Sequence, residues 1–185
     1  MKLRGIPKTL LLIAFIFVLP ILVAKLLLDQ GWYEKGYTNK GVFFKEHLTY
    51  SHMSMRNPML GLWQVAYVLP QICQDDCLAQ LALMRNSWMA LGRKQDRVSL
   101  VVFVHPDSDP LIKQQIHNSD LYIWMKTPKD FAKRFHEQEL MIIDPLGKFI
   151  LHYEGSKKKS ESEKIMGNRD LMLDLRKLLT FSKAG

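Results

Sequence analysis

The chain has 185 residues, a formal net charge of +8 and two cysteines. Four of its 26 basic residues lie within or just before an apolar N-terminal segment, which leaves 22 basic against 18 acidic residues for the remainder. The densest basic run, residues 156–164, alternates in sign after its first lysines, as a solvated loop does. The sequence therefore lacks the concentrated basic patch of a nucleic-acid-binding protein, and we expect no nucleic-acid partner.

Residues 9–28 contain a single charge, at Lys25, and are otherwise almost entirely apolar. About 20 apolar residues are enough for one helix across a bilayer. Cations precede this run (Lys2, Arg4 and Lys8), so the positive-inside rule keeps residues 1–8 in the cytoplasm. A cleaved signal peptide is the alternative, but no A-x-A-like cleavage site follows the run. We therefore expect an uncleaved transmembrane anchor over residues 9–28.

This topology carries the rest of the chain across the membrane. For a bacterium it predicts a single-pass inner-membrane protein with a periplasmic C-terminal domain. Residues 29–60 are rich in turn formers and are expected to be a linker, and residues 61–185 suit one compact domain. Disulfides form and persist in such a compartment, so Cys73 and Cys77 are candidates for a redox or metal-binding pair.

The first half of the domain predicts alternating strands and helices. Runs of β-branched and aromatic residues predict buried strands at 62–69 and 97–104. From about Gln74 to Gly92 the apolar spacing becomes helical, with one face made of Cys77, Leu81, Met84, Trp88 and Leu91. A short helix is expected over 110–117.

The second half begins with a further predicted helix, in which Thr127 is the N-cap and Pro128 the first residue. Residues 139–153 predict a hairpin, because its turn has Asp144, Pro145 and Gly147 at positions favoured in a type I turn. The last helix, within 169–179, is expected to direct leucines inward: Leu171, Leu175, Leu178 and Leu179.

This order of elements predicts an α/β, thioredoxin-like domain, with a central mixed sheet flanked by helices. The first crossover is expected to be parallel and right-handed. It brings Cys73 and Cys77 to the carboxyl end of a central strand and the start of a helix, where α/β folds place their chemistry.

The spacing of Cys73 and Cys77 places both side chains on one face of a helix start, so their sulfurs can meet one ion or each other. Helix N-termini favour thiolates, whereas the neighbouring Asp75 and Asp76 oppose them. Two thiolates with one imidazole suit Cu(I) and can hold Cu(II). A permanent disulfide is the alternative, although such a short loop gains only about 2 kcal/mol in the chain-entropy model.

Three stretches together resemble the Sco/SenC family of thioredoxin-fold, membrane-anchored cytochrome c oxidase assembly proteins. WQVAYVLPQICQDDC (63–77) resembles the strand and C-x-x-x-C loop of that family, with Asp75 at the loop aspartate. VVFVHPDSDP (101–110) and MIIDPLGKFILHY (141–153) resemble two further family motifs. The similarity covers residues 62–180, and the compact length is closest to the short Sco-like proteins associated with oxidase assembly.

The resemblance implies a copper-handling factor for oxidase assembly, with copper as Cu(I) or Cu(II) and with oxidase subunits or other assembly factors as partners. Cys73 and Cys77 match the family's sulfur ligands, and would also be the catalytic pair if the protein is redox-active. His136, eight residues before Asp144, matches the position of the third ligand. His136 could instead be the polar end of the preceding helix, and the resemblance leaves open whether the protein is an enzyme.

Two departures from related sequences affect this hypothesis. Leu78 replaces a proline found in many Sco proteins, and Glu139 stands where thioredoxins have a cis-proline. The second departure argues against a general disulfide oxidoreductase. Other ligand candidates are His105, near the cysteine end of a strand, and the residues of the linker: His47, His52, Met53, Met55 and Met59.

Three hypotheses follow. The chain delivers or guards copper for the oxidase, it reduces disulfides in an oxidase subunit, or it is a non-catalytic scaffold that binds assembly partners.

Overall fold

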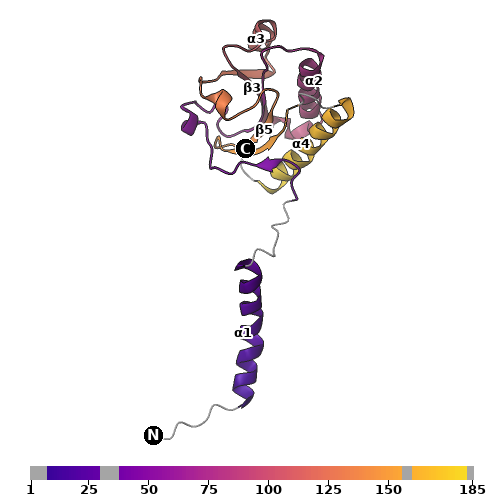
Figure 1. The fold of residues 1–185 in the computed structure, drawn as a ribbon. Coiled ribbons are helices and arrows are strands. Elements are labelled where there is room, and N and C mark those ends of the chain that lie inside the picture. Colours follow the sequence, from indigo (N-terminus) through magenta and orange to yellow (C-terminus); the bar gives the residue numbers. More distant parts are fainter. Residues whose placement is uncertain (1–7, 30–37, 156–159, 183–185) are drawn as a thin grey trace. The chain divides into compact units, whose positions relative to one another are not determined.

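The computed structural model describes residues 8–29, 38–155 and 160–182, in two units divided at Thr38. The first unit contains the helix α1 (Lys8–Asp29; Figure 1). The described side chains of this helix are exposed. Its segment Lys8–Leu27 spans 20 residues at a mean hydropathy of 2.9 and is long and apolar enough to cross a membrane. This helix fits the expected anchor, while residues 1–7 lie outside the described part of the chain.

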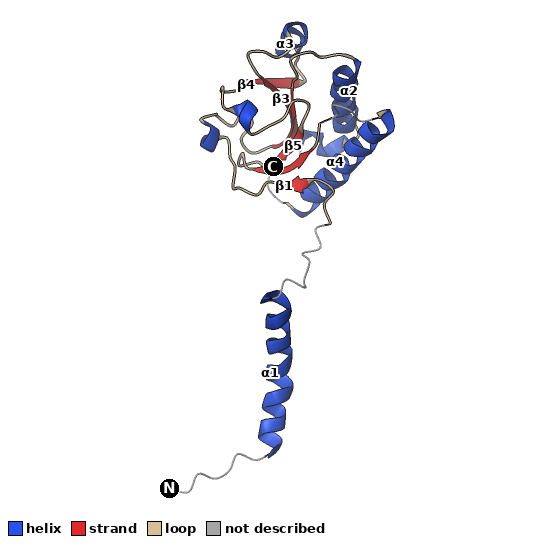
Figure 2. Ribbon diagram, in the orientation of Figure 1, coloured by secondary structure: helices blue, strands red, loops and turns tan. Residues whose placement is uncertain are grey.

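The second unit is built on a six-stranded mixed sheet of order β1-β6-β5-β2-β3-β4. The neighbours β2–β3 and β3–β4 are parallel, and the remaining pairs are antiparallel. The strands are β1 (Val42–Phe43), β2 (Trp63–Val68), β3 (Val98–Val104), β4 (Tyr122–Lys126), β5 (Leu140–Ile143) and β6 (Phe149–Tyr153). The parallel first crossover and the hairpin confirm the predicted thioredoxin-like fold (Figure 2).

Three helices pack on one face of this sheet: α2 (Asp75–Met89), α3 (Pro110–His117) and α4 (Glu161–Phe181). Figure 1 shows α2 and α4 side by side. The core between them and the sheet includes Cys77, Leu81, Met84, Leu171, Leu175 and Leu179. These residues are the predicted inward positions of both helices, so the helical periodicity is confirmed.

The helix ends follow local capping chemistry. Asp109 caps α3, and Gly92, at φ +57°, follows the end of α2. Ser160 caps α4 through a capping box with Glu163. Helix α4 therefore starts within the run expected to be a solvated loop, and residues 156–159 of that run lie outside the described residues.

The prediction of a helix that begins at Pro128 is wrong. The N–H and Oγ1 of Thr127 both donate to the carbonyl of Val104, which extends the pairing of β4 with β3. Thr127 is therefore tied to the sheet and cannot cap a helix. Only one 3-10 turn follows, at Phe131–Lys133. Strand β4 is not among the predicted elements, because its residues lack a clear alternation of buried and exposed side chains.

The opposite face of the sheet is covered by residues that were expected to be a linker. Tyr50 is buried, and its hydroxyl donates to Oε1 of Gln64 on β2 at 2.6 Å. Leu48 and Met53 join the same apolar cluster, and β1 pairs with β6. The compact unit therefore begins at Asn39 and not at residue 61. A buried glutamine on a central strand needs hydrogen-bond partners, and this segment supplies them.

A buried carboxylate fixes the start of this unit. Oδ2 of Asp174 on α4 accepts hydrogen bonds from the backbone N–H groups of Lys40 (2.7 Å) and Gly41 (2.9 Å) and from the Tyr153 hydroxyl (2.9 Å). Charge-assisted bonds of this kind are among the stronger ones in proteins. They hold the backbone of Gly41 against the ring of Tyr153.

We predict that Gly41→Ala destabilises the fold by about 1–3 kcal/mol, because overpacking a closed site costs that much. An added Cβ would lie 2.6 Å from Cζ of Tyr153, and the ring cannot move without straining its bond to Asp174. Gly167→Ala is the matched control. It lies within α4 with no atom within 4 Å of the new Cβ, so it should be neutral or stabilising by up to about 1 kcal/mol. Urea unfolding of the full chain in detergent compares the two, and equal stability would contradict the close contact.

Candidate functional site

The two cysteines lie on the connection from the central strand to the first helix of the domain. Strand β2 ends at Val68, and the N–H of Leu69 still donates to the carbonyl of Phe103 on β3 at 3.0 Å. The chain then turns, and Gln74 precedes α2 as its N-cap. The sequence therefore placed Cys73 and Cys77 correctly, at the carboxyl end of a parallel strand and the start of a helix.

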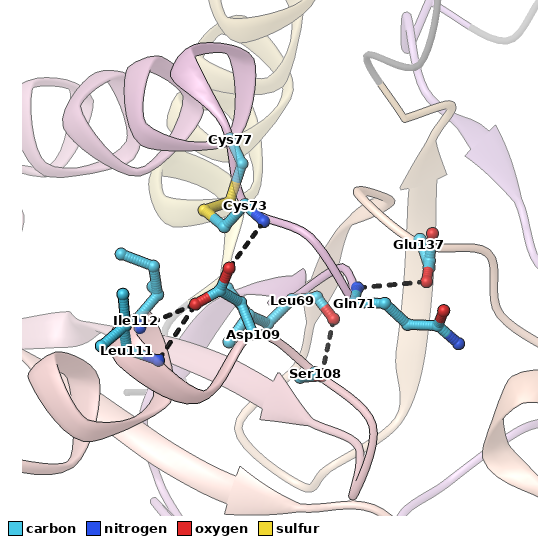
Figure 3. The surroundings of a disulfide bond; sticks show 9 residues. All are labelled: Leu69, Gln71, Cys73, Cys77, Ser108, Asp109, Leu111, Ile112 and Glu137. Carbon is cyan, nitrogen blue, oxygen red and sulfur yellow. Dashed lines mark hydrogen bonds between the residues drawn. A yellow bond between two sulfur atoms is a disulfide. The ribbon is translucent and has the colours of Figure 1, made fainter.

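Cys73 and Cys77 are joined by a disulfide with their Cα atoms 5.1 Å apart (Figure 3). In this form neither sulfur is the thiolate that binds a metal ion or attacks another disulfide. The structure thus holds the oxidised state of the pair. Both the redox and the permanent-disulfide interpretations of the sequence agree with it.

The two sulfur-bearing residues differ in their access to solvent. Cys77 is 0% exposed and belongs to the core, whereas Cys73 is half-buried at the edge of the same cluster. An external thiolate therefore reaches Cys73 more easily. Attack there would release Cys77 as the leaving thiolate, in the first turn of α2, where free N–H groups favour negative charge.

Two carboxylates hold the cysteine loop from either side (Figure 3). Oδ2 of Asp109 accepts the backbone N–H of Cys73 at 3.1 Å, and Oε1 of Glu137 accepts that of Gln71 at 3.2 Å. Asp109 precedes α3 and Glu137 precedes β5. The loop is therefore fixed to two segments that are distant from it in sequence.

Asp109 also binds the start of α3, where its Oδ1 accepts the N–H groups of Leu111 (3.0 Å) and Ile112 (3.2 Å). These bonds hold the pKa of Asp109 below its usual value, and the bond from Cys73 is the largest cause. Donors that bind a carboxylate favour its ionised form. Asp109 is thus an anion beside the disulfide.

His136 is exposed and follows the 3-10 turn at Phe131–Lys133. It lines an open hollow of about 590 Å³ together with Glu137, Glu139, His152 and Glu154. Within the described ranges, no three His, Cys, Asp or Glu side chains form a group that could hold a metal ion. The disulfide form therefore does not assemble Cys73, Cys77 and His136 as ligands.

Glu139, at the position of the thioredoxin cis-proline, is buried at 5% exposure. Its two oxygens are occupied, because Oε1 lies 2.8 Å from Nδ1 of His152 and Oε2 accepts the N–H of His136 at 2.9 Å. His152 is half-buried on β6, as expected for a strand-face residue. This pair fixes the segment between His136 and β5.

The other ligand candidates are placed as follows. His105 lines a hollow of about 200 Å³ beside Gln71 and Glu137, and its Nδ1 lies 3.4 Å from Oδ2 of Asp107. His52 bonds to Thr49 at 3.0 Å, and Met53 is buried in the core. Met53 therefore fills space in the core and is not available as a copper ligand.

Sequence reasoning missed the two carboxylates that hold the loop. Asp109 carries a recognisable signal, since an aspartate before a proline at a helix start predicts an N-cap. The same signal says nothing about Cys73, because the contact joins residues 36 positions apart. No sequence pattern around Glu137 predicts its contact with the cysteine loop.

We predict that after reduction Cys73 is alkylated at least about tenfold faster than Cys77, because reactivity follows the exposure of the thiol. Cys77 is completely buried and must wait for local opening of the first turn of α2. Timed alkylation followed by peptide mass spectrometry measures both rates in the same sample. Equal rates for the two thiols would show that the reduced loop does not keep the burial seen here.

Comparison with known proteins agrees with this fold. Residues 63–182 match the family model described as transmembrane-like, thioredoxin-like, C-terminal domain. No curated protein sequence matches the chain. Among solved structures, apo Sco1 from Thermus thermophilus superposes with a TM-score of 0.50 at 13% identity, over 78% of this chain and 99% of that one.

Two other solved structures are similar at lower scores. A SCO1/SenC family lipoprotein from Bacillus anthracis has a TM-score of 0.47 and 17% identity, covering 78% of this chain and 96% of that one. Copper-bound Sco1 from yeast has a TM-score of 0.49 and 14% identity, covering 80% and 96%. At these identities the likeness to Sco/SenC proteins is one of fold. Since the family model matches residues 63–182, the chain belongs to the transmembrane-like, thioredoxin-like family.

Proposed function

We propose that this chain is a membrane-anchored factor in cytochrome c oxidase assembly, and that it acts through Cys73 and Cys77 outside the cytoplasm. The observation that carries the proposal is the disulfide between them at the carboxyl end of β2, with Cys73 accessible. The motifs that resemble Sco/SenC proteins supply the link to copper and the oxidase. Two of the three motifs meet at this end of the sheet, where Asp109 contacts Cys73.

In this proposal copper is the cargo of the reduced protein. Two thiolates are soft donors of the type that suits Cu(I). His136 is the proposed third ligand. Its neighbour Glu137 already contacts the cysteine loop at Gln71, so His136 belongs to a segment that is bonded to this loop. The ring of His136 is exposed and can turn without displacing core side chains.

A second candidate function is reduction of a disulfide in an oxidase subunit, which the unequal exposure of the two cysteines favours. The thiolate of Cys73 would attack the partner's disulfide and form a mixed disulfide, which releases one partner thiolate. The thiolate of Cys77 would then attack Cys73 and release the second. Two electrons pass from the chain's dithiol to the partner, and the disulfide seen here is the product.

For the topology, we propose that α1 spans the bacterial inner membrane over residues 9–28, with residues 1–8 in the cytoplasm and the domain in the periplasm. The length and hydropathy of α1 support a membrane span, and the cations before it support the orientation. The oxidising side of the membrane also agrees with a disulfide at Cys73.

We predict that the reduced full chain in detergent binds one Cu(I), measured by competition against a Cu(I) chelator. Cys73→Ser and Cys77→Ser should each abolish chelation, because only one soft sulfur donor then remains. His136→Ala should weaken binding by about tenfold, or about 1.4 kcal/mol, because both sulfurs remain. Binding should also fall at low pH, since the ligands must lose protons.

His105→Ala is the matched control for loss of an imidazole near the cysteine loop. If His136→Ala binds as the wild type does and His105→Ala does not, then His105 is the ligand. If the reduced wild type binds no Cu(I) but reduces a disulfide peptide, the reductase candidate is correct. If neither activity is found and a double Cys→Ser variant still supports oxidase assembly, the protein is a scaffold.

We predict that a reporter enzyme active only outside the cytoplasm is active when fused after Gly185, because the cations before α1 retain the N-terminus inside. A reporter active only in the cytoplasm is the control, fused at the same position. Activity of the control alone would overturn the proposed orientation and the periplasmic location of the cysteines.

A further inference from the structure

A single carboxylate, that of Asp109, connects the cysteine loop to α3. Its Oδ2 accepts the Cys73 N–H at 3.1 Å, while its Oδ1 accepts the Leu111 and Ile112 N–H groups at 3.0 and 3.2 Å. Figure 3 shows the carboxylate between the cysteine loop and the first turn of α3. Both oxygens are therefore in use, one for each segment.

The residues around Asp109 hold it in place. Its own N–H donates to the carbonyl of Pro70 at 3.0 Å, at the start of the cysteine loop. The preceding residue, Ser108, is buried and donates from Oγ to the carbonyl of Leu69 at 2.8 Å. Helix α3 is in turn packed into the core by Ile112 and Ile116. The carboxylate is thus mounted on a packed part of the domain, and it restrains Cys73 from there.

We propose that Asp109 is a positioning residue for the Cys73–Cys77 pair, and that its bond to the Cys73 N–H makes the disulfide harder to reduce. This inference rests on the proposed function only in that the pair must undergo thiol–disulfide exchange. The bond restrains Cys73 where its Cα lies 5.1 Å from that of Cys77, within the range that a disulfide requires. Coupling between two equilibria is reciprocal, so a bond that favours the disulfide is weaker in the dithiol, where the loop loosens.

Asparagine separates the two roles of this side chain. Asn is as good an N-cap as Asp, so Asp109→Asn can keep the α3 contacts through its one oxygen. Its other end is an NH₂ group, which faces the Cys73 N–H and cannot accept from it. Asp109→Ser also retains a capping oxygen but is too short to reach both segments. Both variants therefore remove the link to Cys73 and preserve the helix cap.

The test is the redox equilibrium of the full chain in detergent with dithiothreitol. Two electrons and two protons pass from dithiothreitol to the chain disulfide, giving the chain dithiol and cyclic oxidised dithiothreitol. Alkylation and mass spectrometry give the ratio of the two forms. Asp109→Asn and Asp109→Ser should shift the equilibrium toward the dithiol by about tenfold, or about 30 mV for a two-electron couple. The measurement is made at about pH 6, well below the usual thiol pKa, so that the thiols of the chain dithiol and of dithiothreitol are protonated.

Asp107→Asn is the matched control, because it removes the same charge from the same loop. Asp107 pairs with His105 and not with the cysteine loop. Its shift should be less than about twofold, whereas an equal shift would mean that general electrostatics and not positioning is at work. Unchanged potentials in folded Asp109→Asn and Asp109→Ser variants would overturn the inference and leave the proposed function intact. A wild-type pair that neither exchanges with dithiothreitol nor binds Cu(I) would overturn the proposed function itself.

A second measurement needs no variant. In the oxidised wild type the Cys73 amide should exchange slowly with deuterium, because it is hydrogen-bonded to Asp109. On reduction its exchange should become at least about tenfold faster as the loop loosens, while the amide of Leu69, which follows β2 and pairs with β3, should change little. An identical rate for Cys73 in both forms would show that the bond does not respond to the disulfide, and the proposal would fail.

Discussion

Strand β2 is hydrogen-bonded along both edges, to β3 and β5, and its six residues are all buried. The position of the cysteine loop depends on this placement. A strand in that position cannot shift or fray, so the chain leaves it at one fixed point, the carboxyl edge beside the ends of β3 and β4. The loop that carries Cys73 starts from this point, and the segments before α3 and β5 come to meet it.

This geometry gives the disulfide an asymmetric setting. One sulfur belongs to the core beneath α2, and the other lies at the surface of the loop. Core packing therefore restrains Cys77, whereas polar contacts restrain Cys73.

The sequence predicted the elements whose apolar pattern is strong. The two parallel strands, the inward face of α2 and the hairpin turn at Asp144–Gly147 were placed correctly, because each is encoded by nearby residues. The local pattern does not predict strand β4. It predicts a cap at Thr127, because it cannot show that Thr127 bonds to Val104, which is distant in sequence. The segment around Tyr50 resembles a linker in sequence, because the hydrogen bond of the buried Tyr50 is made to Gln64 on another segment. Long-range contacts decided each of these cases.

The candidate site shows the same division. Cys73 and Cys77 could be located from spacing and position, whereas the contacts of Asp109 and Glu137 join segments that no local pattern relates. His136 is predicted as a ligand from its position eight residues before Asp144. That spacing does not determine the orientation of an exposed ring. The hydrogen bond from its N–H to the buried Glu139 could not be foreseen from either residue type.

The bonds of Asp174 have a consequence for the choice of an expression fragment. The sequence alone would place the boundary at residue 61. A fragment that starts there lacks Lys40 and Gly41, so the buried carboxylate of Asp174 loses two backbone donors and keeps the Tyr153 hydroxyl. It also lacks Tyr50, so Gln64 on the central strand would lose a donor and one face of the sheet would lose part of its cover. A fragment that begins at Asn39, where the second unit starts, retains these contacts.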